Sequence, residues 1–332
     1  MSTSLSRSPT HPWPKVLKFR LSPKGARFRV GERVKGQLTL VSYGYATGYE
    51  FQLTYYRSID SNTVTRRIAL GHLVMTPDHF GVDGVGVFGF PQRVDALPFQ
   101  DGHFALTDYV ELSVRRRGTQ EVVYRQSKPL TVRNSGITYR PQPARLPLSG
   151  QHIDEGALPL LGMVTVFLLF FGLSDGSQQV VALIISAPLL IYFFHRWLQY
   201  RRFAQASLRI EKSTVDHWRI ALKAPQRISL VDSHLTLRVR KVYRIVDREG
   251  NASTHRSDLY RRTVHTIDAL LPPDDDKEGA LIVAFPQPDR VLPPTTTIQD
   301  MGVEWQLTYH HQPTFWFRME RQWNLQVSLA PR

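Results

Sequence analysis

Apolar and polar residues alternate along most of this chain. A period of two puts every second side chain on the same face, which is typical of strands that are buried on one side. In the first half the alternating runs are Val16–Leu21, Arg33–Val41, Glu50–Tyr55 and Asp108–Val114. In the second half they are Ser233–Tyr243, Ala280–Phe285, Val303–Tyr309 and Trp323–Leu329. Turn residues separate the runs, so the pattern predicts an all-β fold with two tandem β-sandwich domains of the immunoglobulin-like kind.

The two halves also share a spacing of prolines. The first half has Phe90-Pro91, Leu97-Pro98 seven residues later, and a strand from Tyr109; the second has Phe285-Pro286, Leu292-Pro293 and a strand from Trp305. Proline cannot donate to a strand ladder, so each pair marks a place where pairing stops. The matched offsets predict an internal repeat of one β module.

Between the halves the pattern changes to two uncharged apolar segments, Ala157–Leu173 and Gln179–Phe194. The polar turn Ser174–Gln178 separates them. As helices they would be roughly 24–26 Å long, a little shorter than a bilayer core of about 30 Å. They predict a transmembrane helical hairpin within residues 157–203. Two alternatives stay open, a buried helical hairpin inside a soluble protein and a re-entrant hairpin that does not cross fully.

The charges beside these segments predict an orientation. Arginines lie on both flanks, at Arg140 and Arg145 before the hairpin and at Arg209 after it, whereas the turn carries only Asp175. The positive-inside rule then places both large domains in the cytoplasm, as in a bacterial inner-membrane protein with two spans.

Basic and aromatic residues alternate directly after the second apolar segment. Their types suit the headgroup region of a bilayer, where they would contact anionic lipids. Ordinary anchoring without lipid recognition is the alternative. The predicted membrane-interface residues are Arg196, Trp197, Tyr200, Arg201 and Arg202.

These observations predict five segments. They are a disordered tail (1–14), a first β-sandwich domain (15–135), a linker (136–156), the hairpin with its basic and aromatic exit (157–203) and a second β-sandwich domain (204–332). The tail has no apolar core, so it is not expected to be a signal peptide.

The net charge favours one kind of partner, and the absence of cysteine excludes several kinds of site. The formal net charge is +14. Because the excess is spread over both halves and forms no single stripe, a lipid surface is a better expected partner than nucleic acid. The chain has no cysteine. This excludes disulfides, thiolate zinc sites, iron–sulfur clusters and cysteine nucleophiles.

No motif predicts catalysis, a cofactor or a metal. The acidic run Asp274–Glu278 lacks the ligand spacing and the glycine of a calcium loop, and the Gly81–Gly89 segment lacks the helix that a phosphate loop needs. His310 and His311 are adjacent and would point to opposite faces of a strand, and His255 and His265 add no ligand spacing. We therefore expect a protein that is not an enzyme.

One segment resembles a known family. Phe28–Leu40 contains Gly31-Glu32-Arg33-Val34-Lys35-Gly36, which resembles the Gly-Glu-x-Val-x-Gly opening of an arrestin-like amino-terminal domain. The proline series resembles later parts of both arrestin-like domains, and the resemblance covers about two thirds of the chain. It implies two β-sandwiches that act as a scaffold or adaptor without catalysis. The second half lacks the opening motif, and the apolar hairpin lies where the hinge between such domains would be.

The expected function is that of a non-enzymatic, membrane-anchored scaffold or adaptor. It would bind an unidentified protein partner through its β-sandwich domains, for example at an exposed edge strand. Two alternatives remain, a membrane-bound enzyme with its site between the domains and a structural subunit of a larger membrane complex or oligomer.

Overall fold

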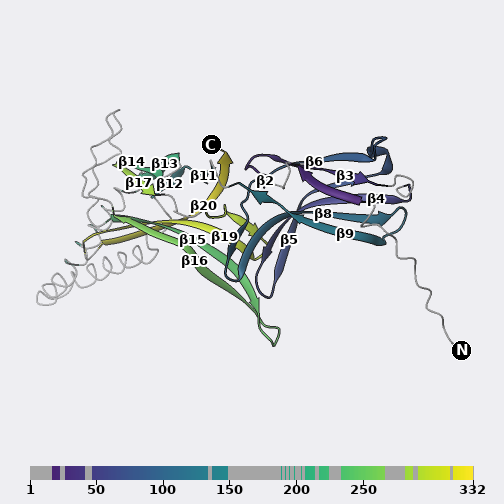
Figure 1. Ribbon diagram of the computed structural model, residues 1–332. Coiled ribbons are helices and arrows are strands. Elements are labelled where there is room, and N and C mark those ends of the chain that lie inside the picture. Colours follow the sequence, from purple (N-terminus) through teal and green to yellow (C-terminus); the bar gives the residue numbers. More distant parts are fainter. Residues whose placement is uncertain are drawn as a thin grey trace, which may run out of the picture.

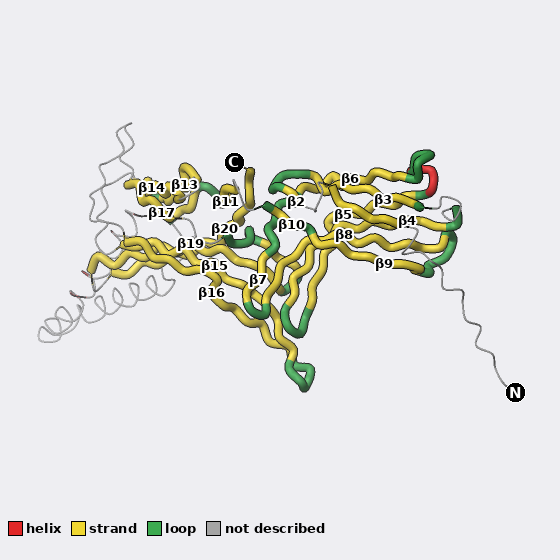
Figure 2. Tube along the Cα trace, in the orientation of Figure 1, coloured by secondary structure: helices red, strands yellow, loops and turns green. Residues whose placement is uncertain are grey.

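The computed structural model describes residues 17–22, 27–41, 47–133, 137–148, 188, 191, 194, 198, 203, 206–213, 217–223, 233–265, 281–286, 291–314 and 317–331. Strands make up most of this part of the chain (Figure 2). The fold is therefore all-β with several sheets, which confirms the coarse prediction from the alternating pattern.

The first half contains two larger sheets. One has the order β1-β3-β6, and the other has the order β5-β4-β8-β7 with β9 also paired to β8. The strands are β1 (Leu17–Ser22), β3 (Arg33–Leu40), β4 (Tyr49–Asp60), β5 (Thr65–Met75), β6 (Val85–Arg93), β7 (Phe99–Asp101), β8 (Phe104–Arg116) and β9 (Val122–Pro129). A short parallel pair joins β2 (Arg27–Phe28) to β10 (Thr131–Val132), and the 3-10 turn η2 (Pro77–His79) follows β5.

The second half also has two larger sheets. One has the order β11-β20-β19-β15-β16 with β18 paired to β19, and the other has the order β12-β13-β14-β17. The strands are β11 (Ile137–Gln142), β12 (Arg145–Pro147), β13 (Ser207–Ser213), β14 (His217–Lys223), β15 (Ser233–Val246), β16 (Ala252–His265), β17 (Leu281–Pro286), β18 (Thr296–Ile298), β19 (Met301–Thr314) and β20 (Phe317–Pro331).

The two halves share most of their strand order, apart from β11 and β12, which are additional in the second half. β5-β4-β8, with β7 and β9 on β8, matches β16-β15-β19, with β18 and β20 on β19. Likewise β1-β3-β6 matches β13-β14-β17. This order agrees with the repeated spacing of Phe-Pro and Leu-Pro in the sequence.

In each half the core lies between two sheets. Along β1 the residues alternate between buried and exposed, with Leu17, Phe19 and Leu21 buried. In the first half Tyr55 of β4 contacts Phe90 of β6, with ring centroids 5.9 Å apart. In the second half Trp218 of β14 stacks on Trp305 of β19 at 5.9 Å. Since each contact joins strands of different sheets, the apolar faces of the sheets pack against each other.

The Leu-Pro element of the second half fixes a loop to this core. Leu292 is fully buried. The indole Nε1 of Trp305 donates to the Pro293 carbonyl oxygen at 3.0 Å. Tyr139 of β11 donates through its hydroxyl to the Leu292 carbonyl oxygen at 3.0 Å. The predicted motif thus marks a loop that the core holds by side-chain hydrogen bonds.

Residues within the predicted linker pair with the second half. β11 pairs antiparallel with β20, from Ile137 opposite Pro331 to Gln142 opposite Gln326. β12 pairs antiparallel with β13. The chain therefore enters the sheets of the second half before it reaches the apolar segments.

The two halves lie end to end and meet through the tips of their long hairpins (Figure 1). Asp300, next to β19, accepts from Arg66 of β5 at 3.1 Å and from Arg244 of β15 at 2.9 Å. Lys241 of β15 donates to the carboxylate of Asp101 at 2.7 Å. The Ser61 hydroxyl donates to the Arg244 carbonyl oxygen at 2.8 Å. These junction contacts are polar and ionic.

The predicted transmembrane hairpin needs correction. Among the described residues, no helix is long and apolar enough to cross a bilayer. This finding contradicts the two-span integral membrane protein, its transmembrane helices and its bacterial inner-membrane location. The prediction was wrong because a run of uncharged apolar residues shows only that the segment avoids water. It does not show whether lipid or another part of the protein surrounds the segment.

Most of residues 157–203 lie outside the described residues. The described positions are Pro188, Ile191, Phe194, Leu198 and Phe203, and all five are helical. Phe203 is buried, and its ring lies 5.0 Å from the ring of His311 in β19. The end of this segment therefore packs against the second half.

Candidate functional site

The outer face of sheet β1-β3-β6 is basic. Because side chains alternate along a strand, the buried apolar residues of β1 and β3 leave Lys18, Arg20 and Lys35 exposed on the opposite face. Ser22 is directly opposite Lys35, and Arg20 is directly opposite Gln37. The cations therefore come from two neighbouring strands and lie within reach of one ligand.

An open cleft of about 840 Å³ lies on this sheet, and of the three cations Lys35 lines it. Its lining combines charged and polar side chains from β1 and β3 with exposed positions of β6, where Val87 is 75% exposed. The lining residues are Ser22, Glu32, Arg33, Lys35, Val87, Phe88, Gly89, Phe90 and Pro91. The cleft thus offers cations next to an apolar strip.

One pair at this cleft is unfavourable for stability. Arg33 of β3 is directly opposite Arg93 of β6, and both are exposed. Like charges directly opposite each other destabilise a strand pair. An anionic group bound between the two strands would relieve this repulsion. The carboxylate of Glu32 is already engaged, since it accepts from the Arg29 backbone N–H at 2.8 Å.

Lys128 of β9 adds a further cation at the edge of β1. Its ammonium group donates to the Phe19 carbonyl oxygen and lies 5.2 Å from the centroid of the Phe19 ring. Burial and the positive charge of Arg20 lower the pKa of Lys128. This lysine therefore ties β9 to β1 and adds to the positive field there.

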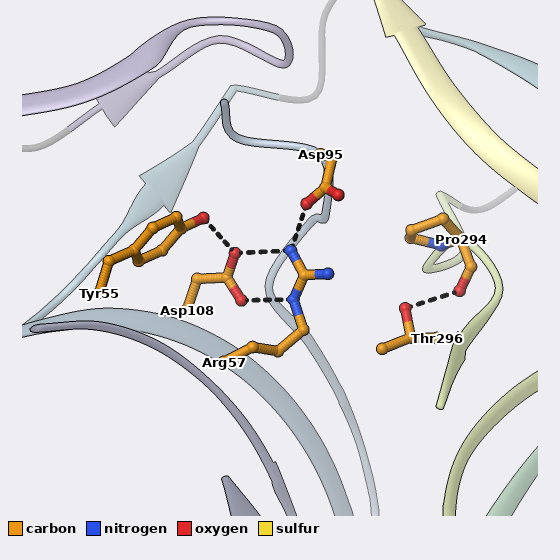
Figure 3. Close-up of polar contacts among 6 residues, drawn as sticks. All are labelled: Tyr55, Arg57, Asp95, Asp108, Pro294 and Thr296. Atoms are coloured by element: carbon orange, nitrogen blue, oxygen red, sulfur yellow. Dashed lines mark hydrogen bonds and ion pairs between the residues drawn. The ribbon is translucent and has the colours of Figure 1, made fainter. Parts of the chain in front are cut away.

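A buried polar cluster lies between the sheets of the same half (Figure 3). Arg57 of β4 is opposite Asp108 of β8 and donates to it at 2.8 Å through Nε and at 2.9 Å through Nη2. Tyr55 donates to the same carboxylate at 2.7 Å. Arg57 also donates to Asp95, whose side chain is 65% exposed.

Electrostatics keep this cluster charged. Burial alone would lower the pKa of Arg57, but the hydrogen bonds and the charge of Asp108 and Asp95 raise it above its ordinary value. Burial, followed by the charge of Asp108, raises the pKa of Tyr55. Tyr55 therefore stays neutral and Arg57 stays cationic at neutral pH. Since the partners of Arg57 are carboxylates, the cluster is suited to joining β4, β8 and the loop after β6, and its role here is structural.

The residues singled out from the sequence have different outcomes. Arg196, Trp197, Tyr200, Arg201 and Arg202 lie outside the described residues, as does the acidic run 274–278. Gly84 adopts a positive φ of 69° in the turn before β6.

The adjacent histidines of β19 point to opposite sides, as expected for a strand. His311 is buried and hydrogen-bonded to Ser233 at 2.6 Å, whereas His310 is on the outer face. In the part of the chain that the structure describes, no group of three or more His, Cys, Asp or Glu side chains is arranged to hold a metal ion.

Sequence reasoning missed both the basic cleft and the Arg57 cluster. The alternation along β1 and β3 is the signal that could have found the outward-facing Lys18, Arg20 and Lys35, but it does not show that β6 lies beside β3 and completes the cleft. The sequence signal for the Arg57 cluster was weak. Arg57 and Asp108 interrupt the apolar pattern of their strands, and they are 51 residues apart in the chain.

Comparison with known proteins adds no family to this geometry. No protein-family model matches the sequence, and no curated protein is detectably similar to it.

Proposed function

We propose that this chain is a non-enzymatic adaptor whose first half binds an acidic segment of a protein partner. The observation that carries the proposal is the basic face of sheet β1-β3-β6 beside its open cleft. Lys18, Arg20 and Lys35 supply the cations, and the cleft supplies Arg33 and the exposed Val87. A carboxylate-rich strand with an occasional apolar residue complements this surface in charge and in polarity.

The finer architecture fits the same role. We infer that each half is an arrestin-like β-sandwich, on the basis of the Gly31–Gly36 motif, the shared strand order and the core between two sheets. Gly36 itself has a packing reason to be glycine, because an added Cβ would be 2.4 Å from the Arg20 carbonyl oxygen. Glycine at this position therefore lets β1 lie close against β3, and these two strands carry the three cations of the basic face.

Binding of an acidic probe tests the proposal. A fluorescein-labelled peptide of ten glutamates is titrated with the full chain at low salt, and its anisotropy is measured. We expect saturable binding that weakens as salt rises, because salt screens exposed charges over about 10 Å at 0.1 M. The triple variant K18Q/R20Q/K35Q should weaken binding by at least about tenfold, since each lost charge contact contributes roughly 0.5 kcal/mol or more.

A charge-matched variant serves as the control. R256Q/R261Q/R262Q removes three arginines from the exposed strand β16 of the second half, so it lowers the net charge by the same amount. It should bind the peptide like the wild-type chain. If both triple variants weaken binding equally, only the net charge matters and the proposed site is wrong.

A further inference from the structure

Three histidines and one glutamate form a row across the second half. The register pairs His265 of β16 with His234 of β15, His234 with His310 of β19, and His310 with Glu320 of β20. Residues in direct register point to the same face, so this row (the histidine ladder) lies on the outer face of one sheet. It crosses four neighbouring strands near one end of the sheet.

The rings of the ladder are in contact. His234 and His310 stack with centroids 4.5 Å apart and an angle of 19° between the planes, and His234 lies 5.6 Å from His265. His310 Nδ1 lies 3.5 Å from the Glu320 carboxylate. Neutral rings stack favourably at this distance, whereas two protonated rings repel each other.

Among the described residues, Glu320 is the one anion in the row of the ladder. Among the described residues, the next row on this face is Thr263, Thr236, Thr308 and Gln322, which carry no charge. The row beyond it adds the cations Arg261 and Arg238, of which Arg238 is paired with Asp258 at 2.5 Å. On the opposite face of the sheet, His311 is buried beside Phe203. Glu320 can therefore balance one added proton but not two.

We propose that the histidine ladder is a pH-sensitive latch that holds the end of edge strand β16 on β15. When the rings are neutral, stacking keeps the four strands in register at this end. When pH falls and a second ring takes up a proton, repulsion separates β16 from β15 at the His265 end. The backbone groups of β15 that faced this end of β16 are then exposed at the edge of the sheet. This inference does not depend on the basic face of the first half.

The direction of the effect follows from the environment of His234. Burial, and then the charges of His310 and His265, lower the pKa of His234, while Glu320 acts in the opposite sense. Because the folded state binds this proton less readily than the unfolded chain, the contribution to stability is complete above the ordinary histidine pKa. It is lost as pH falls through the lowered value.

Amide hydrogen exchange tests the latch in the full chain. Exchange is measured at pH 7.5 and 5.5 and corrected for the intrinsic pH dependence of the amides. We expect the protection of residues 259–265 to fall by about tenfold or more at pH 5.5, while residues 252–257 of the same strand keep theirs. Unchanged protection of 259–265 would overturn the proposal. Equal loss of protection throughout the chain would overturn it as well, since that result describes global acid unfolding.

Two variants with opposite effects test the ladder directly. Titration of the histidine ring signals by NMR should give a higher midpoint for His234 in H310Q, which removes a neighbouring cation, and a lower midpoint in E320Q, which removes the anion. H72Q in β5 of the first half is the control and should leave the His234 midpoint unchanged. Glu320 is exposed, so E320Q folds even if H310Q does not. A His234 midpoint that E320Q leaves unchanged would show that the ladder is not electrostatically coupled and would overturn the proposal.

Discussion

At the scale of single residues, the first half depends on a buried ion pair. Arg57 and Asp108 are both less than 10% exposed, and together with Tyr55 they satisfy each other's hydrogen bonds. Such a pair adds little net stability compared with apolar residues, but removing one partner leaves an uncompensated charge in the core. The two carboxylates that contact Arg57 should therefore differ strongly in importance.

Asp108→Asn should lower the free energy of unfolding of the first half by about 3–5 kcal/mol, because Arg57 stays buried without its main counter-charge. Asp95→Asn removes the exposed partner of the same guanidinium and should cost no more than about 1 kcal/mol. Urea denaturation followed by circular dichroism measures both. Equal losses for the two variants would show that burial of Asp108 is not what makes its charge important.

At the scale of elements, the close contact between β1 and β3 requires a glycine at position 36. A Cβ at Gly36 would be 2.4 Å from the Arg20 carbonyl oxygen and 2.5 Å from the Phe88 ring. A backbone oxygen cannot move aside without disturbing the pairing of β1 with β3. Gly89 of the adjacent strand is different, because its added Cβ would be 3.8 Å from the Lys35 side chain, which is an ordinary van der Waals contact.

Gly36→Ala should therefore destabilise the first half by about 1–3 kcal/mol, the usual cost of overpacking. Gly89→Ala should change stability by less than about 0.5 kcal/mol. Thermal unfolding compares the two, and amide exchange of residues 17–22 shows whether β1 is the strand that loosens. Tolerance of alanine at Gly36 would mean that β1 can move away from β3 at little cost.

Elements were also the level at which the sequence was most informative. All eight alternating runs coincide with strands, which are β1, β3, β4 and β8 in the first half and β15, β17, β19 and β20 in the second. Alternation is a local property, so it gives the strands and the buried face of each. It does not say which strands are neighbours.

The rest of the fold depends on which strands pair with each other. Nothing local in Ile137–Gln142 points to its partner Phe317–Pro331, almost 190 residues later. The histidine ladder was not accessible from the sequence, because the register set by the turn at Asp247–Gly250 would place His234 opposite Val264. Only the register shift between Val239 and Arg240 brings His265 opposite His234. His310 and Glu320 join it only through the sheet order. The prediction of a transmembrane hairpin failed for a related reason, since composition alone does not show what covers an apolar segment.

At the scale of the whole molecule, charged and polar side chains bridge the two halves. Asp300 bridges Arg66 of the first half and Arg244 of the second, and Lys241 reaches Asp101 across the junction. The hydrogen bond from Arg66 is the main reason that the pKa of Asp300 is lowered. Contacts of this kind are weakened by salt and by acid far more than apolar packing is.

Asp300→Asn should let the halves move apart or rotate at neutral pH, because the amide keeps the shape of the carboxylate but loses its attraction for both arginines. In the wild-type chain the same change should appear in acid. The lowered pKa makes the attraction complete above the ordinary carboxyl pKa and removes it as pH falls through the lowered value.

Because the chain has no cysteine, V82C and Q322C can carry spin labels at one exposed site in each half. The distance distribution between the labels should be broader in D300N and in wild type at high salt. Asp247→Asn is the matched control, because the backbone N–H of Asn251 lowers the pKa of Asp247 within the β15–β16 turn. A distribution that D300N leaves as narrow as D247N does would show that apolar contacts, and not the charges, set the angle between the halves.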